Sequence, residues 1–552
     1  AHLTVRRPSG RWRFGGGRSR SARRSGKMAV MPPRLRTRYL TTAAAAAIAL
    51  TAAACSSGQS PSASSASDGA GASGNASVAG SLSWHNCTEG GAAMQCSSVR
   101  VPLNYADPSG RKITLALSRI QATAPRSQQQ GVLLVNPGGP GGSGLSLAAF
   151  VAEGLSPQVA ADYDIIGFDP RGVGSTVPAL HCDPGFFDKV MPDYIPASQA
   201  AEQAMENRAK QYADDCEKKF GWLLPYMTTQ DVARDLNSIR IALGQQKISY
   251  FAYSYGTYIG QVFATMFPNR VRRMALDSIV DPEGVWYTDN IDQDYAFQGR
   301  MNAFYAWVAA NDSTYHLGST ETAVRDVWYR VRTRLETHPI DGSSGPLIGP
   351  DEYDNTFLTG DYNDALWPGL AAAFASYVQT GSAKQLISQY QTYGVQDENE
   401  FAVYNAVQCS DVDWPRSWAY WNSDTRLVYR SAPLEAWDNA WYNAACAFWP
   451  IKGPAKPLQI KGTGLPGILM LQGTLDPATP YAGAMVAHKL LPSSRIVVVE
   501  GGGNHGQSLS QPPNNCVNGY LNRYLATGAL PGKGGPGAVN AACAALPAPS
   551  AS

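Results

Sequence analysis

Three residues of the chain have the types and the order needed for nucleophilic hydrolysis, namely Ser254, Asp476 and His505. A serine hydroxyl is a weak nucleophile unless a histidine accepts its proton, and the histidine in turn needs a carboxylate that fixes its tautomer. Ser254 lies in the segment YFAYSYGTY, between an apolar run and a helix-like run. A sharp strand-to-helix turn at this point would hold its hydroxyl out. The pattern predicts acyl transfer.

Such a turn needs small residues two positions before and after the serine, because the strand and the helix approach closely there. Here they are Ala252 and Gly256, so the segment departs from G-x-S-x-G by one methyl group. Alone it is weak evidence, since a serine at a helix N-cap gives a similar pattern. Asp476 and His505, however, each follow an apolar run, at residues 467–471 and 495–500. The order Ser, Asp, His is that of an α/β-hydrolase, and we predict a catalytic triad.

A glycine-rich loop follows the apolar run at residues 132–136, in VLLVNPGGPGGSG. Its backbone N–H groups can turn toward a ligand. A Walker-type phosphate loop is disfavoured because the segment lacks a Gly-Lys-Ser/Thr ending. An oxyanion hole fits better, with one N–H from this loop and one from Tyr255, the residue after the nucleophile.

The rest of the pattern predicts the elements that position these residues. Helical patterns lie between several of the short apolar runs, and residues 229–243 place Val232, Leu236 and Ile239 on one helix face. This alternation predicts a mostly parallel sheet covered on both faces. We predict strands at residues 113–117, 131–136, 163–168, 248–253, 272–277, 467–471 and 495–500.

The stretch from residue 282 to 457 breaks the alternation, because it is rich in Trp, Tyr, Asp and Asn and has few strand-like runs. We interpret it as a mainly helical lid inserted into the sheet domain. The predicted organisation is a leader and signal peptide at 1–54, a flexible tether at 55–80, a first part of the core at 81–281, the lid at 282–457 and a second part of the core at 458–552.

The charge distribution separates the N-terminus from the rest. Residues 1–54 hold 12 of the 45 Lys and Arg and no Asp or Glu, so the chain from residue 55 onward has 33 basic and 43 acidic residues. A net charge of −10 argues against nucleic acid as a partner of that part. Arginines precede an apolar run at residues 39–54, as in a secretory signal. This run is too short to predict a membrane-spanning helix.

Cys55 follows this run directly, where a bacterial lipoprotein signal places its lipidated cysteine. A plain secretory signal cleaved after an A-x-A sequence is the alternative, and both predict a location outside the cytoplasm. Membrane attachment would occur only through a lipid on Cys55.

Eight cysteines remain after Cys55, an even number that indicates disulfides in an exported chain. Sequence alone allows 105 connectivities. We predict pairing of neighbours, which closes four modest loops: 87 with 96, 182 with 216, 409 with 446 and 516 with 543. A metal site is disfavoured because no cysteine pair has C-x-x-C spacing and no histidine lies in an H-E-x-x-H pattern.

Together these motifs resemble the secreted tripeptidyl aminopeptidases of actinobacteria, relatives of the proline iminopeptidases in the α/β-hydrolase fold. The resemblance covers residues 85 to 545. The segments that carry it are NPGGPGGSG at 136–144, DYDIIGFDPRGVGST at 162–176, the serine turn with FPNRVRRMALDSIVDP at 267–282, GTLDPATP at 473–480 and NHG at 504–506.

The resemblance implies Ser254, Asp476 and His505 as the triad, Gly138 and Tyr255 as the oxyanion donors, peptides as substrates, and no cofactor or metal. The sequence departs from the family at two positions. Ala252 replaces the first glycine of the serine turn, and Ser278 stands where the family more often has Gly.

An aminopeptidase must recognise the α-ammonium of its substrate, which requires carboxylates at a fixed distance from the serine. We expect them in the lid, with Asp411 and Asp413 as candidates because Cys409 would hold their loop rigid. Two other functions remain open. An esterase or lipase would use the same triad, and a surface lipoprotein could keep the fold as a binding module, although intact triad residues argue against that.

Overall fold

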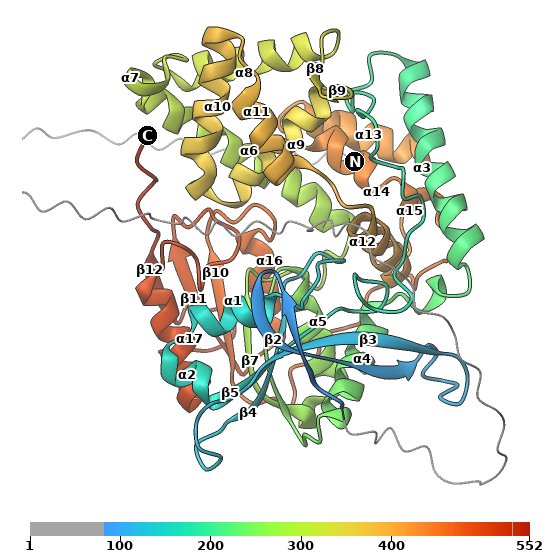
Figure 1. Ribbon diagram of the computed structural model, residues 1–552, viewed down its shortest axis with the longest axis vertical. Coiled ribbons are helices and arrows are strands. Elements are labelled where there is room, and N and C mark those ends of the chain that lie inside the picture. Colours follow the sequence, from blue (N-terminus) through green and yellow to red (C-terminus); the bar gives the residue numbers. More distant parts are fainter. Residues whose placement is uncertain (1–81, 533, 552) are drawn as a thin grey trace, which may run out of the picture. The chain divides into compact units, whose positions relative to one another are not determined.

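The computed structural model describes residues 82–532 and 534–551. The predicted signal peptide, the tether and Cys55 lie outside the described residues. A ten-stranded sheet runs through the structure in the order β1-β2-β3-β5-β4-β6-β7-β10-β11-β12. β1, β2, β3 and β5 pair antiparallel, and all pairs from β5 to β12 are parallel. The prediction of a mostly parallel sheet is therefore confirmed (Figure 1).

The strands of this sheet are β1 (His85–Glu89), β2 (Ala92–Pro102), β3 (Lys112–Ile120), β4 (Gly131–Asn136), β5 (Tyr163–Phe168), β6 (Ile248–Tyr253), β7 (Val271–Asp277), β10 (Ile468–Gly473), β11 (Ser494–Glu500) and β12 (Ala541–Ala544). All seven predicted strands are present. The prediction missed β1 and β2, and it missed β12, whose sequence AACA has too few large apolar residues to indicate a strand.

Helices cover both faces of the sheet. One face carries α1 (Leu147–Gly154), α2 (Pro157–Asp162) and α17 (Asn515–Thr527), and the other carries α4 (Thr229–Ala242), α5 (Tyr255–Met266) and α16 (Tyr481–Leu490). Each layer encloses its own apolar core. The sequence of a strand that is buried on both faces is a nearly continuous apolar run, as in GVLLVN of β4.

Helix α4 shows how local sequence sets these elements. Thr228 precedes it and its hydroxyl accepts a hydrogen bond from the N–H of Asp231, which satisfies one of the free donors at the helix start. Val232, Leu236 and Ile239 face the core, as their spacing predicts.

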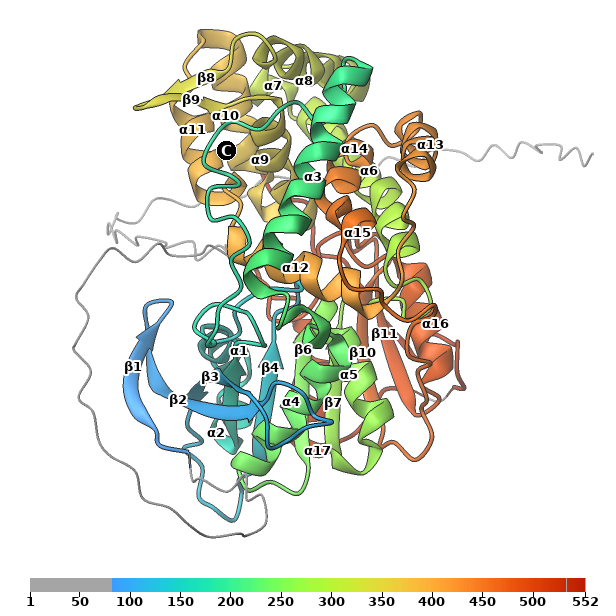
Figure 2. The same ribbon diagram turned by 90° about the vertical axis from the view of Figure 1, so that its right-hand side faces the viewer.

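The segment predicted as a lid is mainly helical and lies between β7 and β10 in the chain. It contains α6 (Tyr287–Ala310), α7 (Asp312–Tyr315), α8 (Glu321–Leu335), α9 (Pro350–Tyr362), α10 (Trp367–Thr380), α11 (Lys384–Gln389), α12 (Glu398–Asp411), α13 (Trp418–Tyr429), α14 (Ala436–Asn443), α15 (Ala445–Phe448) and a small hairpin of β8 (Ile340–Gly342) and β9 (Gly345–Ile348). Figure 2 shows these helices grouped beyond one end of the sheet strands. The helix α3 (Gln199–Phe220) comes from between β5 and β6 and packs against α15, which the sequence analysis did not predict.

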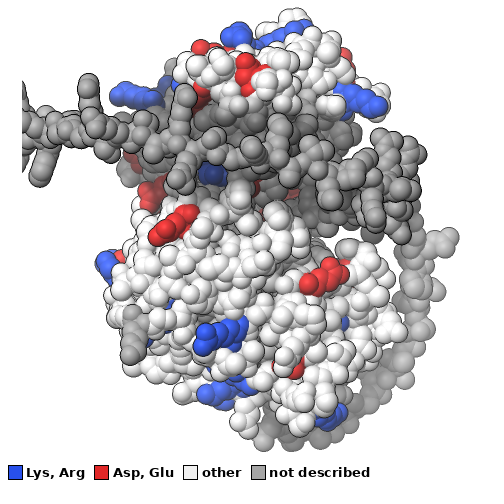
Figure 3. Space-filling view, turned by 90° about the vertical axis from the view of Figure 1, so that its left-hand side faces the viewer, with Lys and Arg blue, Asp and Glu red and all other residues white. Residues whose placement is uncertain are grey.

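Four disulfides join the eight cysteines as predicted, with pairs Cys87–Cys96, Cys182–Cys216, Cys409–Cys446 and Cys516–Cys543. The last of these ties β12, an edge strand, to α17. None of the helices within residues 82–532 and 534–551 is long and apolar enough to cross a membrane. On the face drawn in Figure 3, charged side chains are scattered and neither sign forms a continuous patch.

Candidate active site

Ser254 lies between the end of β6 and the start of α5, as predicted for a nucleophile on a sharp turn. Its φ of +56° is rare for a residue with a side chain and is a feature of such a turn. A Cβ on Gly256 would lie 2.9 Å from the Cβ of Ala252. The turn therefore accepts the methyl group of Ala252 because residue 256 has none.

The base and the acid of the predicted triad are in contact. Nδ1 of His505 lies 2.9 Å from Oδ1 of Asp476, and the same oxygen accepts the N–H groups of Ala478 and Thr479 at 3.1 Å. Asp476 is only 2% exposed. Burial lowers the pKa of His505, but the charge and hydrogen bond of Asp476 outweigh it and leave that pKa raised. The arrangement stabilises the protonated imidazole that forms when it accepts a proton.

The loop that carries His505 packs against the residue that precedes the nucleophile. The hydroxyl of Tyr253 donates to the carbonyl oxygen of Ser508 at 3.0 Å, and a Cβ on Gly506 would lie 3.4 Å from the Tyr253 ring. Ser254, Asp476 and His505 thus all lie in loops at the carboxyl ends of parallel strands, β6, β10 and β11. This edge is where ligand sites collect in such sheets.

The predicted oxyanion donors lie beside the nucleophile. A Cβ on Gly138 would lie 2.7 Å from the Cβ of Ser254 and 3.1 Å from the backbone nitrogen of Tyr255. The N–H of Tyr255, at the start of α5, has no partner among the described residues. The N–H of Gly138 instead donates to Oδ1 of Asn136 at 3.0 Å. The next N–H along the loop, that of Gly139, has no partner in the described part of the chain.

Comparison with known proteins agrees with this geometry. A family model described as the alpha/beta hydrolase fold matches residues 131–510, which contain the sheet from β4 to β11 and all three triad residues. The chain belongs to the α/β-hydrolase family.

Three curated relatives are similar to this hydrolase over most of their length. It is 41% identical over 472 residues to a tripeptidyl aminopeptidase of Streptomyces lividans, covering 83% of this chain and 86% of that one. It is 30% identical over 460 residues to the serine protease Hip1 of Mycobacterium tuberculosis, covering 80% and 86%. A protein named carboxylesterase B, also from Mycobacterium tuberculosis, is 30% identical over 476 residues, covering 82% and 89%.

The segment predicted as a lid contacts the loop of His505 directly. The N–H of His505 donates to the carbonyl oxygen of Tyr362 at 2.8 Å, and the two rings meet edge to face with centroids 5.5 Å apart. Asn504 and Asp364 exchange two further hydrogen bonds, at 2.9 and 3.0 Å. Tyr362 at the end of α9 and Asp364 just after it therefore hold the loop of His505.

Asp411, a predicted ammonium ligand, is occupied by protein groups. Its carboxylate accepts the N–H of Thr229 at 2.7 Å, the hydroxyl of Thr229 at 2.5 Å and the indole N–H of Trp286 at 3.3 Å. The Thr229 hydroxyl in turn contacts the hydroxyl of Tyr255 at 2.8 Å. Burial raises the pKa of Asp411 to about 7 in spite of these donors. The side chain anchors the start of α4 behind the nucleophile turn.

Asp413, the second predicted ligand, forms ion pairs at the surface. Its oxygens lie 3.2 Å from Nζ of Lys452 and 3.6 Å from Nε of Arg416. Neither candidate therefore presents a carboxylate without a partner, as ammonium recognition requires.

We expect Asp411→Asn to lower the free energy of unfolding by about 1–3 kcal/mol, because it disturbs buried hydrogen bonds to a charged group. Asp413→Asn should change it by less than about 1 kcal/mol, as for other partly exposed ion pairs. Urea unfolding measures both effects. In neither variant should the preference for a free over an acetylated substrate N-terminus change. Loss of that preference in Asp411→Asn at unchanged stability would restore Asp411 as the ammonium ligand.

The predicted lid also contains carboxylates that the sequence analysis did not single out. Glu400 of α12 and the pair Glu435 and Asp438 at α14 form no hydrogen bond or ion pair through their carboxylates within the described residues. Burial raises the pKa of Glu400 to about 7 and that of Asp438 to about 8, and it raises the pKa of Glu435 well above its usual value. No sequence signal separated these residues from the many solvated acids of the lid.

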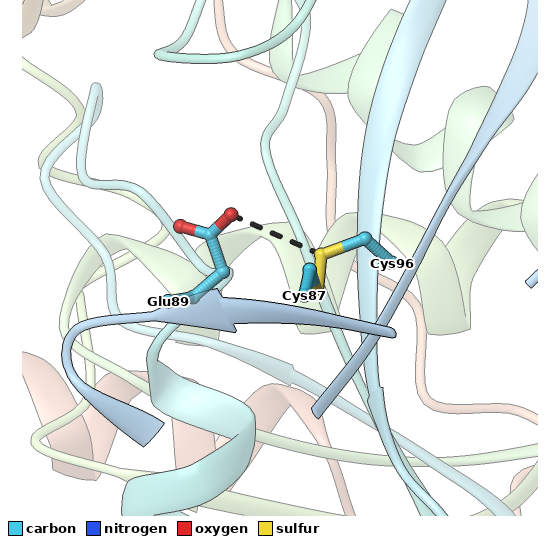
Figure 4. A group of neighbouring side chains, drawn as sticks. All are labelled: Cys87, Glu89 and Cys96. Atoms are coloured by element: carbon cyan, nitrogen blue, oxygen red, sulfur yellow. Dashed lines mark hydrogen bonds between the residues drawn. A yellow bond between two sulfur atoms is a disulfide. The ribbon is translucent and has the colours of Figure 1, made fainter. Parts of the chain in front are cut away.

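One cluster of metal-ligating residue types occurs among the described residues, formed by Cys87, Glu89 and Cys96 (Figure 4). The two sulfur atoms are bonded to each other in a disulfide, so neither is a thiolate that could bind a metal. The cluster lies on β1 and β2, at the far edge of the sheet from β10 and β11.

Proposed function

We propose that this hydrolase is an extracytoplasmic serine exopeptidase that releases short N-terminal units, tripeptides, from peptides. Its nucleophile is Ser254, its base is His505 and its orienting acid is Asp476. The names of two relatives, a tripeptidyl aminopeptidase and a serine protease, support the reaction class.

In the first half of the reaction His505 accepts the proton of Ser254 while the hydroxyl oxygen attacks the scissile carbonyl carbon. The developing oxyanion lies against the N–H of Tyr255 and a second N–H from the glycine-rich loop. Because the N–H of Gly138 is already donated, we assign this second role to Gly139. His505 then gives its proton to the leaving amine, and an acyl-enzyme remains on Ser254.

In the second half a water molecule attacks the acyl-enzyme while His505 accepts its proton. Collapse of the second tetrahedral intermediate returns that proton to Ser254 and releases the N-terminal unit with a new carboxylate. All proton transfers use side chains of this chain.

The observation that carries the exopeptidase assignment is the 41% identity to a tripeptidyl aminopeptidase, and the surroundings of Tyr362 indicate where the substrate amine would be recognised. This ring contacts His505, and the negative charges of Glu435, Asp476 and Glu400 all raise the pKa of its hydroxyl, after burial itself. The triad acid and two lid glutamates thus act electrostatically on one side chain beside the base. A peptide whose carbonyl lies at Ser254 would extend its N-terminus toward these glutamates.

Unpaired carboxylates in a buried site are costly, because the charged form loses its hydration. The raised pKa values of Glu400 and Glu435 are the sign of that cost. A substrate α-ammonium would offset it, since it brings the missing positive charge and up to three N–H donors. We therefore replace Asp411 and Asp413 by Glu400 and Glu435 as the proposed ammonium ligands.

The location outside the cytoplasm is supported by the four disulfides, since such bonds persist in oxidising compartments. We also propose export by the signal at 1–54 and, with Cys55 as the lipidated residue, attachment of the protein to the membrane through the tether at 55–80.

An esterase remains the alternative, because one relative is named a carboxylesterase and the triad would be the same. The two functions predict different products and different preferred substrates. With a pool of free peptides, mass spectrometry should find intact tripeptides and the matching shortened peptides. A tripeptide p-nitroanilide should also be hydrolysed with a higher kcat/KM than a p-nitrophenyl acyl ester with no amino group. Hydrolysis of the ester alone would overturn the peptidase assignment.

A further inference from the structure

Three consecutive N–H groups after His505 are held by two residues at the end of β7. Gly506 donates to the hydroxyl oxygen of Ser278 at 2.8 Å, and Gln507 donates to Oδ1 of Asp277 at 2.8 Å. Ser508 donates twice to Oδ2 of Asp277, from its N–H at 2.8 Å and from its hydroxyl at 2.5 Å. Each backbone N–H group of the three residues that directly follow the base therefore has a hydrogen-bond partner at the end of β7.

Asp277 also contacts the nucleophile turn through its backbone. Its carbonyl oxygen accepts the N–H of Ser254 at 3.1 Å, while its carboxylate is fully buried and holds the loop of the base. One residue thus links the backbone of the nucleophile to that of the base. The N–H of Ser278 is in turn held by the carbonyl oxygen of Leu471 in β10, the strand before Asp476.

We infer that Asp277 and Ser278 form a clamp that positions His505 for proton transfer with Ser254, in addition to the triad and the oxyanion donors. Neither side chain touches the reacting atoms, so both are positioning residues. The inference rests on the proposed catalysis by Ser254. Small displacements of a base from its nucleophile lower rates steeply, which is why such a clamp matters for turnover more than for binding.

The backbone of Ser278 supports this role. Its φ is +60°, a conformation that is strained for a residue with a side chain and free of strain for glycine. Glycine would therefore be the simpler residue here, but it could not accept the N–H of Gly506. The serine at position 278 thus adds one hydrogen bond to the loop of the base in spite of its strained backbone.

The charge of Asp277 acts in the same direction as its hydrogen bonds. Burial raises the pKa of Asp277 to about 6, and the donors Ser508 and Gln507 oppose that rise. Its negative charge is also one of the causes of the raised pKa of His505, behind Asp476. The clamp thus favours the protonated form of the base as well as its position.

We expect Asp277→Asn to lower kcat for a tripeptide p-nitroanilide about 100-fold with KM changed less than about twofold. An amide has only one acceptor oxygen, so one of the two N–H groups loses its partner. The rate at which a fluorophosphonate labels Ser254 should fall in parallel, since this reaction needs the base but no peptide site. The acidic limb of the kcat/KM profile should move to lower pH, because a negative charge near His505 is lost.

Ser278→Gly tests the clamp without removing a charge. It should lower kcat about fivefold through the lost hydrogen bond, while relief of the strained backbone keeps Tm within about 3 °C of the parent. The matched control is Asp235→Asn, since Asp235 is an equally buried carboxylate that pairs with Arg171 at 2.8 Å, away from the triad. It should lower Tm and leave kcat of the folded protein unchanged.

The inference is overturned if Asp277→Asn and Ser278→Gly keep the parent kcat and pH profile. It is equally overturned if the activity lost in Asp277→Asn, Ser278→Gly and Asp235→Asn is fully explained by the fraction of each protein that is unfolded. Ser254→Ala separates this result from failure of the proposed function, because full activity of that variant would remove the triad itself.

Discussion

Ser254→Ala should lower kcat for a tripeptide p-nitroanilide by a factor of about 10⁴ or more, because loss of a triad serine removes the covalent route. The fold should persist. No hydrogen bond of the Ser254 side chain exists among the described residues, and alanine keeps the Cβ that packs at the turn. Steady-state kinetics and the fluorophosphonate reaction both measure the loss, and thermal unfolding checks the fold.

The matched control for this variant is Ser249→Ala on the same strand, β6. Ser249 is fully buried and its hydroxyl has no partner among the described residues. Its removal should leave activity unchanged and should not lower Tm. If Ser254→Ala retained a tenth of the parent rate, another residue would have to be the nucleophile.

Acetylation of the substrate N-terminus should lower kcat/KM about 30-fold or more, because an ion pair in a partly desolvated site is worth roughly 2–5 kcal/mol. The measurement compares a tripeptide p-nitroanilide with a free and with an acetylated amine. Glu435→Gln and Glu400→Gln should each lower kcat/KM for the free amine and change that for the acetylated substrate little. Glu336→Gln, an exposed lid residue, is the control and should retain the full preference.

The same preference should depend on pH with a defined sign. An acid with a raised pKa is neutral below that value, and burial raises the pKa of Glu400 to about 7. The preference for the free amine should therefore weaken as pH falls from about 7 to 5. It should also weaken above about 8, where the substrate α-amino group loses its proton. Equal kcat/KM for both substrates at every pH would contradict the aminopeptidase assignment and would indicate an endopeptidase or an esterase.

Much of the catalytic geometry follows from local sequence. The apolar run before Ser254, the helix-like run after it and the small residues Ala252 and Gly256 specify a sharp turn over a few residues. The loops of Asp476 and His505 follow strands that the same kind of pattern identifies. Parallel strands end at one edge of a sheet, so β6, β10 and β11 place Ser254, Asp476 and His505 at the same edge. Pairing of neighbouring cysteines was also predicted, over sequence separations of 9 to 37 residues.

The features that sequence could not reveal depend on contacts between distant segments. The sequence favoured Asp411 and Asp413 over the other lid acids because Cys409 lies beside them. Only the tertiary structure shows that Thr229 and Trp286 already bind the carboxylate of Asp411. The N–H of Gly138 already donates to one side-chain oxygen, that of Asn136, two residues earlier. Whether a polar group is free or already paired depends on every segment that packs around it. The sequence therefore predicts the type of chemistry and three candidate residues for it, whereas tertiary packing decides which carboxylates are already paired within the protein.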